Sequence, residues 1–366
     1  MKTLAQRLAQ ANALLAPYAV PLDGTLGRAI PEEDDATRFP FQRDRDRIIH
    51  TQAFRRLKHK TQVFVAGKGD HYRTRLTHTM EVAQISRDMA RTLSLNEDLT
   101  EAIALAHDLG HTPFGHAGEE AMHEEMQRFG ESFEHNAQSL RVVTQLEERS
   151  KRTPGLNLNH EILEGLQKHR TSFDRGDAAR LPRAPSIEAE IVNLADEIAY
   201  TAHDIDDGLR AGVFSMQNLL PLKLFAEAHR NAGKSGTEVR GSIIHLLVMD
   251  AYGELEHRLK ENHTQTLEDV YGTEAPLVAF SPDMQEKLAA LRAELSERFY
   301  RHPDVLSHSE EGKKIIHFLF RSFEAHPPEK VLELRKKTGG SLPEAIKDYI
   351  AGMTDQFAME QAKKSA

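Results

Sequence analysis

The stretch HDLGHTPFGH, residues 107–116, decides how this chain is interpreted. It places three histidines and one aspartate within ten residues. Gly110 and Pro113 interrupt any helix between them, so we expect one helix to end near Leu109–Gly110 and another to begin near His116–Ala117. Imidazole and carboxylate groups together suit a divalent ion of intermediate hardness. The stretch therefore predicts part of a metal site at the junction of two helices.

The pair His107–Asp108 needs further ligands from elsewhere in the chain. Adjacent residues of a helix diverge by about 100°, so both reach one ion only where helices cross and supply more ligands. Taken alone, the dipeptide also fits a helix end with solvated histidines. Two distant residues are candidates for the missing ligands: His78 opens a predicted helix after the basic segment RTRL, and Asp196 lies inside the longest predicted helix.

Composition excludes several classes of protein. The chain has 366 residues, 39% hydrophobic and 28% charged, which is typical of a globular protein. Because cysteine is absent, we exclude disulfides, a thiolate zinc site and a cysteine nucleophile. The net charge of -9 argues against broad nonspecific DNA binding, although basic residues gather in Arg43–Arg75. No signal-like segment opens the chain and no apolar run approaches the length of a membrane span, so we expect a cytoplasmic protein without membrane contact.

Apolar residues at three- and four-residue spacing predict an all-α fold. We expect a short amphipathic helix and a loop in residues 1–40, a brief extended piece at Val63–Val65 and a turn at Ala66–Asp70. Loops are expected at Lys151–Asn159, Thr171–Pro185 and Val270–Phe280, with a short strand as an alternative in the last. One predicted helix runs from Asn96 or Asp98, either of which is a candidate cap, to the His–Asp pair. The other predicted helices are 41–60, Thr77–Leu93, Ala117–Phe129, Phe133–Arg149, Ile187–Leu209, Asn218–Arg230, Thr237–Lys260, Pro282–Tyr300, Glu311–Phe323 and Leu342–Phe357.

These elements predict one domain, since no internal repeat, low-complexity segment or clean linker divides the chain. Within it we expect three parts. Residues 1–40 form the N-terminal helix and loop, residues 41–215 the catalytic core, and residues 216–366 a C-terminal helical extension packed on that core.

The helix predicted over Ile187–Leu209, with Ser186 as a candidate N-cap, carries a polar stripe. Asp196, Tyr200 and Asp204 follow one another at four-residue spacing, so they drift only about 80° around the helix axis. Burying such a stripe in an otherwise apolar helix is costly unless each group has a partner. A solvated face is the alternative, and it is the interpretation we favour for the neighbouring acids Glu197, Asp206 and Asp207.

Several segments, in order along the chain, carry a resemblance to a known family. The order His78, His107–Asp108, Asp196 resembles the HD metal-dependent phosphohydrolase superfamily. The longer matches, which reach from about residue 43 to residue 358, resemble its deoxyguanosine-triphosphate triphosphohydrolase-like subfamily. They are RDRIIHTQAFRRLKHKTQVF (45–64), TRLTHTMEV (74–82), HDLGHTPFGHAGE (107–119), FEHNAQSL (133–140), ADEIAYTAHDIDDGLRAG (195–212) and GMTDQFA (352–358). A bare His–Asp pair is a weak signal, but this ordered set is highly specific.

The resemblance implies cleavage of a deoxynucleoside triphosphate between the α-phosphorus and the 5′-oxygen, giving a deoxynucleoside and intact triphosphate. It implies that His78, His107, Asp108 and Asp196 bind a divalent metal ion and leave positions open for water and phosphate. Mn²⁺ or Mg²⁺ is favoured, with Fe²⁺ and Co²⁺ as alternatives. The resemblance also implies a homo-oligomer with an even number of subunits, with the C-terminal helices as interface.

His116 and Glu119 are the predicted catalytic residues. The leaving 5′-alkoxide is strongly basic and requires a proton as the bond breaks. His116 matches the proton donor of the family, and Glu119, one helical turn later, would orient the imidazole and favour its protonated form. The alternative for His116 is a residue that only starts a helix. His111 and His135 match positions that approach the substrate phosphates, although either would also fit a helix cap.

Four further residues match substrate-binding positions of the family. Arg75 matches a phosphate-binding arginine of related dNTPases that carry a SAM domain, and Gln62 matches a position that contacts the deoxyribose. Tyr200 and Asp204 match residues that pack on the sugar and hydrogen-bond to it. A tyrosine ring against C2′ would exclude a ribose hydroxyl, while a carboxylate would accept from the 3′-hydroxyl.

One residue departs from the pattern, because Glu197 follows Asp196 where those relatives have a phosphate-binding lysine, and no SAM domain is present. Lys58, Arg55 or Arg56 are the candidates to offset the phosphate charge instead. Two rival functions remain. One is an HD phosphohydrolase that acts on nucleoside monophosphates or cyclic nucleotides. The other is a nucleotide-responsive regulatory protein with weak single-stranded nucleic-acid contact through Arg43–Arg75. The intact ligand set and the His116/Glu119 pair favour an enzyme, since a binding protein needs no acid.

Overall fold

A computed structural model describes residues 2–62, 73–150, 153–169 and 183–365. Regular structure in these residues is helical except for one two-stranded antiparallel sheet, formed by β1 (Glu148–Ser150) and β2 (Thr153–Pro154). The predicted all-α class is therefore confirmed. The predicted extended piece at 63–65, the turn at 66–70 and most of the loop at 171–185 lie outside the described residues.

The first half of the chain follows the predicted helices with two corrections and one addition, since α8 was not predicted. The helix predicted over 41–60 is three short pieces, because the Thr51 side chain accepts a hydrogen bond from the Phe54 backbone N–H (3.1 Å) and starts a new helix. The helix predicted over 133–149 ends early, in a π-helical turn and β1. The helices are α1 (Leu4–Asn12), α2 (Pro40–Ile49), α3 (Gln52–Arg56), η1 (Leu57–His59), α4 (Arg75–Thr92), α5 (Glu97–Ala106), α6 (Gly115–Gln127), α7 (His135–Arg141), η2 (Val142–Leu146), α8 (His160–Gln167) and α9 (Ile187–Arg210).

The second half differs from prediction mainly at its breaks. The helix predicted over 342–357 is two helices that meet at residues 352–354, and the one predicted over 218–230 is also two, separated at residues 220–222. Helix α15 begins at Pro303 instead of residue 311, and α13 and α16 were not predicted. Residues 272–280 form neither helix nor strand, so the alternative of a strand there is wrong. The helices are α10 (Met216–Leu219), α11 (Lys223–Ser235), α12 (Val239–Glu261), α13 (Leu267–Tyr271), α14 (Pro282–Leu295), η3 (Ser296–Tyr300), α15 (Pro303–Ala325), α16 (Glu329–Thr338), α17 (Leu342–Ala351) and α18 (Asp355–Ser365).

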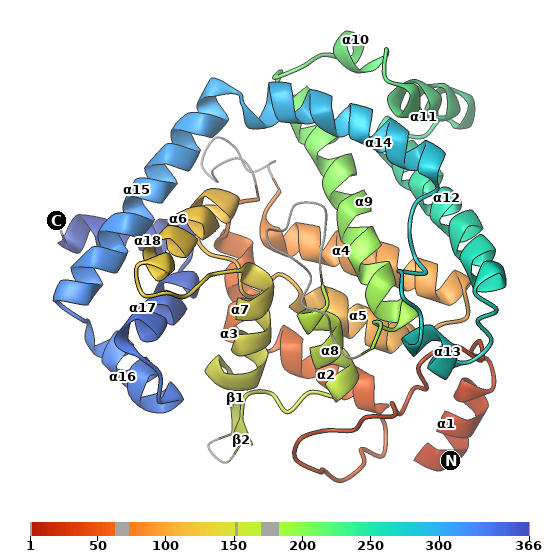
Figure 1. Cartoon of the computed structure of the whole chain (residues 1–366), viewed down its shortest axis with the longest axis horizontal. Coiled ribbons are helices and arrows are strands. Elements are labelled where there is room, and N and C mark those ends of the chain that lie inside the picture. Colours follow the sequence, from red (N-terminus) through yellow and green to blue (C-terminus); the bar gives the residue numbers. More distant parts are fainter. Residues whose placement is uncertain (1, 63–72, 151–152, 170–182, 366) are drawn as a thin grey trace.

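Helix α9 is central in the molecule, and Figure 1 shows it crossing the middle of the fold. It packs against α4, α5, α12 and α14. One large apolar cluster runs from Ala19 to Val305, and a second joins α6 to α15, α17 and α18. The core thus crosses the predicted boundary at residue 215, and the division into three parts stays a prediction. No helix in the described part of the chain is long and apolar enough to cross a membrane.

Because α9 is covered on most sides, it buries charged residues as well as apolar ones. The predicted apolar side is buried, and so is Asp207, which we had expected to be solvated. Asp207 accepts a hydrogen bond from Arg73 (2.9 Å), and burial raises its pKa to about 6. Glu197 is only partly exposed and forms an ion pair with Arg292 of α14. The interpretation of these acids as simply solvated is therefore wrong for Asp207.

Candidate active site

Two helix ends bring the first candidate ligands together. The Thr74 side chain caps α4, which places His78 in its first turn, and the side chain of His78 is almost fully buried. Helix α5 ends at Ala106, slightly earlier than predicted, and His107 is its C-cap. The His107 ring Nδ1 lies 2.6 Å from the Ala104 carbonyl oxygen. A carbonyl oxygen only accepts, so Nδ1 carries the ring proton and donates the hydrogen bond. This bond leaves Nε2 free to act as a ligand atom, a common arrangement behind metal-binding histidines.

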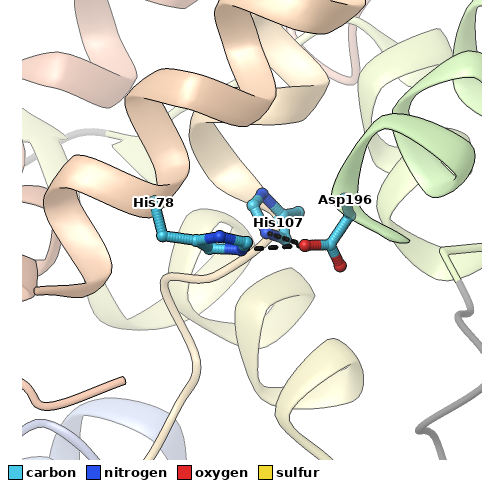
Figure 2. Close-up of side chains that lie close together, drawn as sticks. All are labelled: His78, His107 and Asp196. Carbon is cyan, nitrogen blue, oxygen red and sulfur yellow. Dashed lines mark ion pairs between the residues drawn. The ribbon is translucent and has the colours of Figure 1, made fainter. Parts of the chain in front are cut away.

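His78, His107 and Asp196 point toward one another from three helices (Figure 2). The Asp196 Oδ1 atom lies 2.8 Å from His78 Nε2 and 3.8 Å from His107 Nε2. One donor atom from each residue lies within 4.8 Å of the other two, and all three side chains are buried. His107 Nε2 is buried without a hydrogen-bond partner in the described residues. Two imidazoles and a carboxylate arranged in this way fit a divalent metal ion.

Asp108, the fourth predicted ligand, lies beside this cluster and is held by other groups. Both of its oxygens are 3.1 Å from an Arg75 guanidinium nitrogen, and Oδ1 is 3.0 Å from His111 Nε2. Oδ1 is also 3.7 Å from His107 Nε2, at the edge of the cluster. The structure therefore brings Asp108 next to the other ligands but directs it toward Arg75, and its role as a ligand stays a prediction.

The pKa shifts of Asp196 and His107 favour the forms that bind a metal ion. Burial raises the pKa of Asp196, but the neighbouring charge of His107 and the hydrogen bonds from His169 and His78 outweigh it and hold the pKa well below its usual value. Burial lowers the pKa of His107. For His78, burial also acts to lower the pKa, but Asp196 outweighs it and the pKa is raised. Carboxylates and neutral imidazoles are the forms that bind a metal ion, so the shift of His78 opposes binding while the other two favour it.

The predicted proton donor, His116, is in the first turn of α6, beyond the loop that follows the His–Asp pair. Its side chain is 47% exposed, and its Nε2 lies 3.1 Å from the Tyr200 hydroxyl. Glu119 Oε2 is 3.6 Å from His116 Nδ1, as its place one turn later predicts. Glu119 also accepts hydrogen bonds from the His135 backbone N–H (2.8 Å) and the His135 ring (2.9 Å). One carboxylate therefore positions two histidines, which we did not predict.

His111 and His135 stack directly on each other, with 3.8 Å between ring centroids. Burial lowers the pKa of His111 well below its usual value. His111, Glu119 and His135 form a second group whose donor atoms lie within 4.8 Å of one another. The structure thus places both predicted phosphate-side histidines next to the predicted acid, although neither is shown to contact a substrate.

The predicted sugar-side residues lie along α9 and on the segment before α4. Asp204 accepts a hydrogen bond from the Tyr300 hydroxyl, and burial raises the pKa of Asp204 to about 7. The Tyr200 ring meets the His78 ring edge to face at 5.3 Å. Gln62 is buried, and its side-chain amide makes no hydrogen bond to any described residue. Arg75 is completely buried behind Asp108.

Three residues near the site were missed by the sequence reasoning. His169 Nε2 lies 3.4 Å from Asp196 Oδ2, the ring of His203 lies 5.5 Å from that of His78, and Tyr300 holds Asp204. The available signal was the large number of histidines, 20 in the chain. His203 lies on α9 together with Asp196, inside the matched segment 195–212, so that motif could have pointed to it. No short motif links His169 or Tyr300 to the metal cluster, because they come from other helix ends.

The charge of Glu197 is offset by Arg292, which lies 95 residues away in sequence. The predicted alternatives are placed differently. Arg55 and Lys58 are exposed, and Arg56 donates to the Gly352 carbonyl oxygen (2.6 Å). These contacts do not test whether any of the three offsets the phosphate charge, so that suggestion stays a prediction.

Comparison with known proteins identifies two family models in the chain. The HD domain matches residues 75–201, and the phosphohydrolase-associated domain matches residues 278–364. Three proteins described as deoxyguanosinetriphosphate triphosphohydrolase-like are similar along almost the whole chain. The one from Azoarcus sp. (strain BH72) is 46% identical over 96% of this chain and 96% of its own length. Those from Brucella anthropi and Geobacter sulfurreducens are 45% and 46% identical, over 95% and 96% of this chain and 94% of their own lengths.

Proposed function

This chain belongs to the deoxyguanosinetriphosphate triphosphohydrolase-like family of HD-domain phosphohydrolases, and we propose that it hydrolyses deoxynucleoside triphosphates to a deoxynucleoside and inorganic triphosphate. One observation carries the proposal. The candidate metal ligands His78, His107 and Asp196 lie beside the candidate acid His116, with Tyr200 in contact with both groups. Such an arrangement suits a reaction in which a metal ion stabilises the phosphate and an acid protonates the leaving oxygen.

His78, His107 and Asp196 would hold the divalent ion, with Asp108 adjacent, and we propose Mn²⁺ or Mg²⁺. When bound, the ion would supply a Lewis acid that polarises a phosphoryl oxygen and lowers the pKa of water. Arg75 lies beside this group, and two of its guanidinium nitrogens are buried without a hydrogen-bond partner in the described part of the chain. A triphosphate oxygen would satisfy them.

His116 would donate a proton to the departing 5′-oxygen. It is the exposed member of the histidine group, so a substrate can reach it. Glu119 faces Nδ1, so the proton would be given from Nε2, which lies 3.1 Å from the Tyr200 hydroxyl and would turn its hydrogen bond to the 5′-oxygen of the substrate. Glu119 is ionised, because His135 and His116 outweigh the effect of burial and keep its pKa far below the usual value. Its negative charge would favour the imidazolium form of His116.

The choice of deoxyribose would come from Tyr200 and Asp204. Both are one or two turns beyond Asp196 on α9, so a sugar attached to the metal-side phosphate would lie along this face. The Tyr200 ring is fixed against His78, and there it would leave no room for a 2′-hydroxyl. Asp204, already a hydrogen-bond acceptor for Tyr300, would accept from the 3′-hydroxyl.

The products decide between this function and its rivals. We would incubate the protein with each of the four dNTPs and with GTP, in Mn²⁺ or Mg²⁺ and ¹⁸O-labelled water, and separate the products. The proposal requires a deoxynucleoside and triphosphate, with ¹⁸O in the triphosphate. Pyrophosphate or inorganic phosphate as the first product would indicate another HD phosphohydrolase. Nucleotide binding without any product would indicate a regulatory protein.

The rival nucleic-acid contact gains little from the charges in Arg43–Arg75. Among its described residues, Arg43 and Arg47 pair with Glu32, Arg45 pairs with Asp46, Arg73 pairs with Asp207, and Arg75 pairs with Asp108. Arg55 and Lys58 are exposed and are the cations of this segment that remain most accessible. Arginines already paired with carboxylates release less energy on binding phosphate, because the pair must first be broken. We therefore keep hydrolysis as the proposed function.

A further inference from the structure

The loop between α5 and α6 has an unfavourable backbone conformation. It connects His111 to His116. Its residue Phe114 has a backbone φ of +63°, in the left-handed region that residues other than glycine rarely adopt. Gly115 follows with φ +59°. A residue keeps this conformation only where contacts with the surrounding structure compensate its energetic cost. Contacts from elsewhere in the fold must therefore hold the loop that leads to the candidate acid.

Those contacts come from the C-terminal helices. Asp355, at the start of α18, is 5% exposed and accepts a hydrogen bond from the Phe114 backbone N–H (3.0 Å) through Oδ1. On the other side, the Phe114 side chain packs on Gly312 of α15. A Cβ added at Gly312 would come within 2.7 Å of Phe114 Cβ, so no larger residue fits there. The left-handed residue is thus held from two sides by segments about 200 residues further along the chain.

The same carboxylate also holds the segment before α4. Asp355 Oδ2 accepts from the Thr61 backbone N–H (3.0 Å) and from the Thr61 hydroxyl. Thr61 is bridged to Thr74, the residue that caps α4, and the Arg75 backbone N–H donates to the Lys60 carbonyl oxygen (3.1 Å). Asp355 therefore links the His116 loop directly to the segment that fixes the start of the His78 helix.

Lys60 adds a second link at the same junction. Its ammonium group is buried and donates to the carbonyl oxygens of His111 (2.5 Å) and Ala351 (2.8 Å). The turn at residues 351–355, the segment 60–61 and the loop 111–114 are thus tied together by side chains from two of them. Figure 1 shows α15, α17 and α18 gathered around α6, which is the helix that carries His116.

We propose that Asp355 is a positioning residue that sets the distance between the candidate acid His116 and the metal-side helix α4. It touches neither the candidate ligands nor the acid, and it acts through the backbone at Phe114 and Thr61. This proposal rests on the proposed function, because the positioning matters for a reaction that uses both groups. It also gives the phosphohydrolase-associated region, which includes residue 355, a part in catalysis.

The test compares Asp355→Asn with Asp250→Asn. Asp250 accepts from the backbone N–H (2.8 Å) and hydroxyl (2.7 Å) of Ser281, so it makes two of the same bonds as Asp355 at a place away from the site. An amide keeps the size of the side chain but turns one acceptor into a donor, so its single oxygen cannot take the places of both carboxylate oxygens, one facing Phe114 and the other facing Thr61. Hydrogen–deuterium exchange of the peptide over 109–116 should become at least about tenfold faster in Asp355→Asn only, because local opening becomes easier.

Turnover gives the second measurement. We expect Asp355→Asn to keep its bound metal and to lose about 10- to 100-fold in kcat, since a misplacement of about 1 Å costs on that scale. Asp250→Asn should stay within about twofold of wild type. Two outcomes would overturn the proposal and leave Asp355 as an ordinary stabilising residue. One is an unchanged rate of exchange in the loop of Asp355→Asn. The other is faster exchange in every helix of Asp355→Asn, together with an equal loss of kcat in Asp250→Asn.

The exchange experiment does not depend on the substrate. If wild type hydrolyses no dNTP, the proposed function fails, while the comparison of loop exchange still decides whether Asp355 holds the loop. If Asp355→Asn does not fold, Thr61→Val replaces it. That variant removes one hydroxyl donor, preserves the branched shape, and should give the same pattern with a smaller change in exchange and kcat. A normal kcat and normal exchange in Thr61→Val would then overturn the proposal.

Discussion

Two segments of α9 bury carboxylates in different ways. In the first turn, residues 187–190, Glu188 accepts from the backbone N–H groups of Val20 and Asn96, and Glu190 accepts from those of Leu277 and Val278. In the segment 196–204, the partners of Asp196, Tyr200 and Asp204 are other titratable side chains, namely His78, His116 and Tyr300. Both segments are buried to a similar degree, so burial alone does not distinguish structure from function.

The kind of partner makes the distinction. A backbone N–H does not change its protonation state near neutral pH, so an acid paired with one serves mainly to anchor a loop. An imidazole group can exchange a proton or bind a metal ion, and a phenol group can donate or accept a hydrogen bond. We therefore expect substitutions in the first turn of α9 to change stability, and substitutions in the segment 196–204 to change metal content or turnover.

The largest effect should come from Asp196→Asn, compared with Glu190→Gln as the matched amide change. Asp196→Asn should remove the bound metal and lower turnover by about 10³-fold or more, because a metal ion supplies several kcal/mol and each 1.4 kcal/mol is tenfold. Glu190→Gln should keep both. Metal analysis by mass spectrometry and initial rates check this. Full metal occupancy in Asp196→Asn would remove that residue from the ligand set.

His116→Ala is expected to be the next largest. It should keep its metal and substrate affinity but lose about 10²- to 10⁴-fold in kcat, the usual scale for a lost general acid. A nitrophenyl phosphate ester, whose leaving group needs no proton, should be hydrolysed nearly as well by the variant as by wild type. Glu119→Gln should lose less, because it weakens the orientation of His116 without removing the proton. Equal loss with both substrates would make His116 structural.

The pH dependence of stability should separate the first turn of α9 from the segment 196–204 again. Burial raises the pKa of Glu190 to about 8, from 4.5. Between these values the folded state keeps the proton that the unfolded state has released, so this group's contribution to stability is lost as pH rises through that window. Glu190→Gln lacks this loss. From pH 5.5 to pH 8, its free energy of unfolding should gain about 2–3 kcal/mol relative to wild type, measured by urea unfolding. Parallel pH curves would contradict a buried neutral carboxyl.

The smallest effect concerns the choice of sugar. Tyr200→Ala should narrow the ratio of kcat/KM for dGTP over GTP by roughly tenfold, since it opens space beside C2′. Tyr200→Phe keeps the ring and removes only the hydroxyl that contacts His116, so it should lower kcat and leave the ratio unchanged. Competition between dGTP and GTP measures both. An unchanged ratio in Tyr200→Ala would remove the ring from this role.

Local signals in the sequence predicted most elements and the identity of the candidate groups. Helix caps such as Asn96 and Ser186 bind a backbone N–H only three residues later, so they can be recognised from the sequence without knowledge of the fold. The polar stripe on α9 follows from helix geometry alone. The errors came where a second local signal competed with periodicity. Thr51 restarts a helix, and Gly352–Thr354 divides one that was predicted as continuous.

The sequence by itself determined the helical class and, with the family resemblance, the residues His78, His107, Asp196 and His116, because periodicity, caps and ordered motifs are properties of the chain. Only the tertiary structure decided which way each side chain is held. In the folded chain Asp108 pairs with Arg75, Glu119 contacts both His116 and His135, and Asp355 accepts a hydrogen bond from the Phe114 backbone N–H. These contacts join residues up to 241 positions apart, and their geometry depends on how whole helices pack. No local spacing encodes that packing.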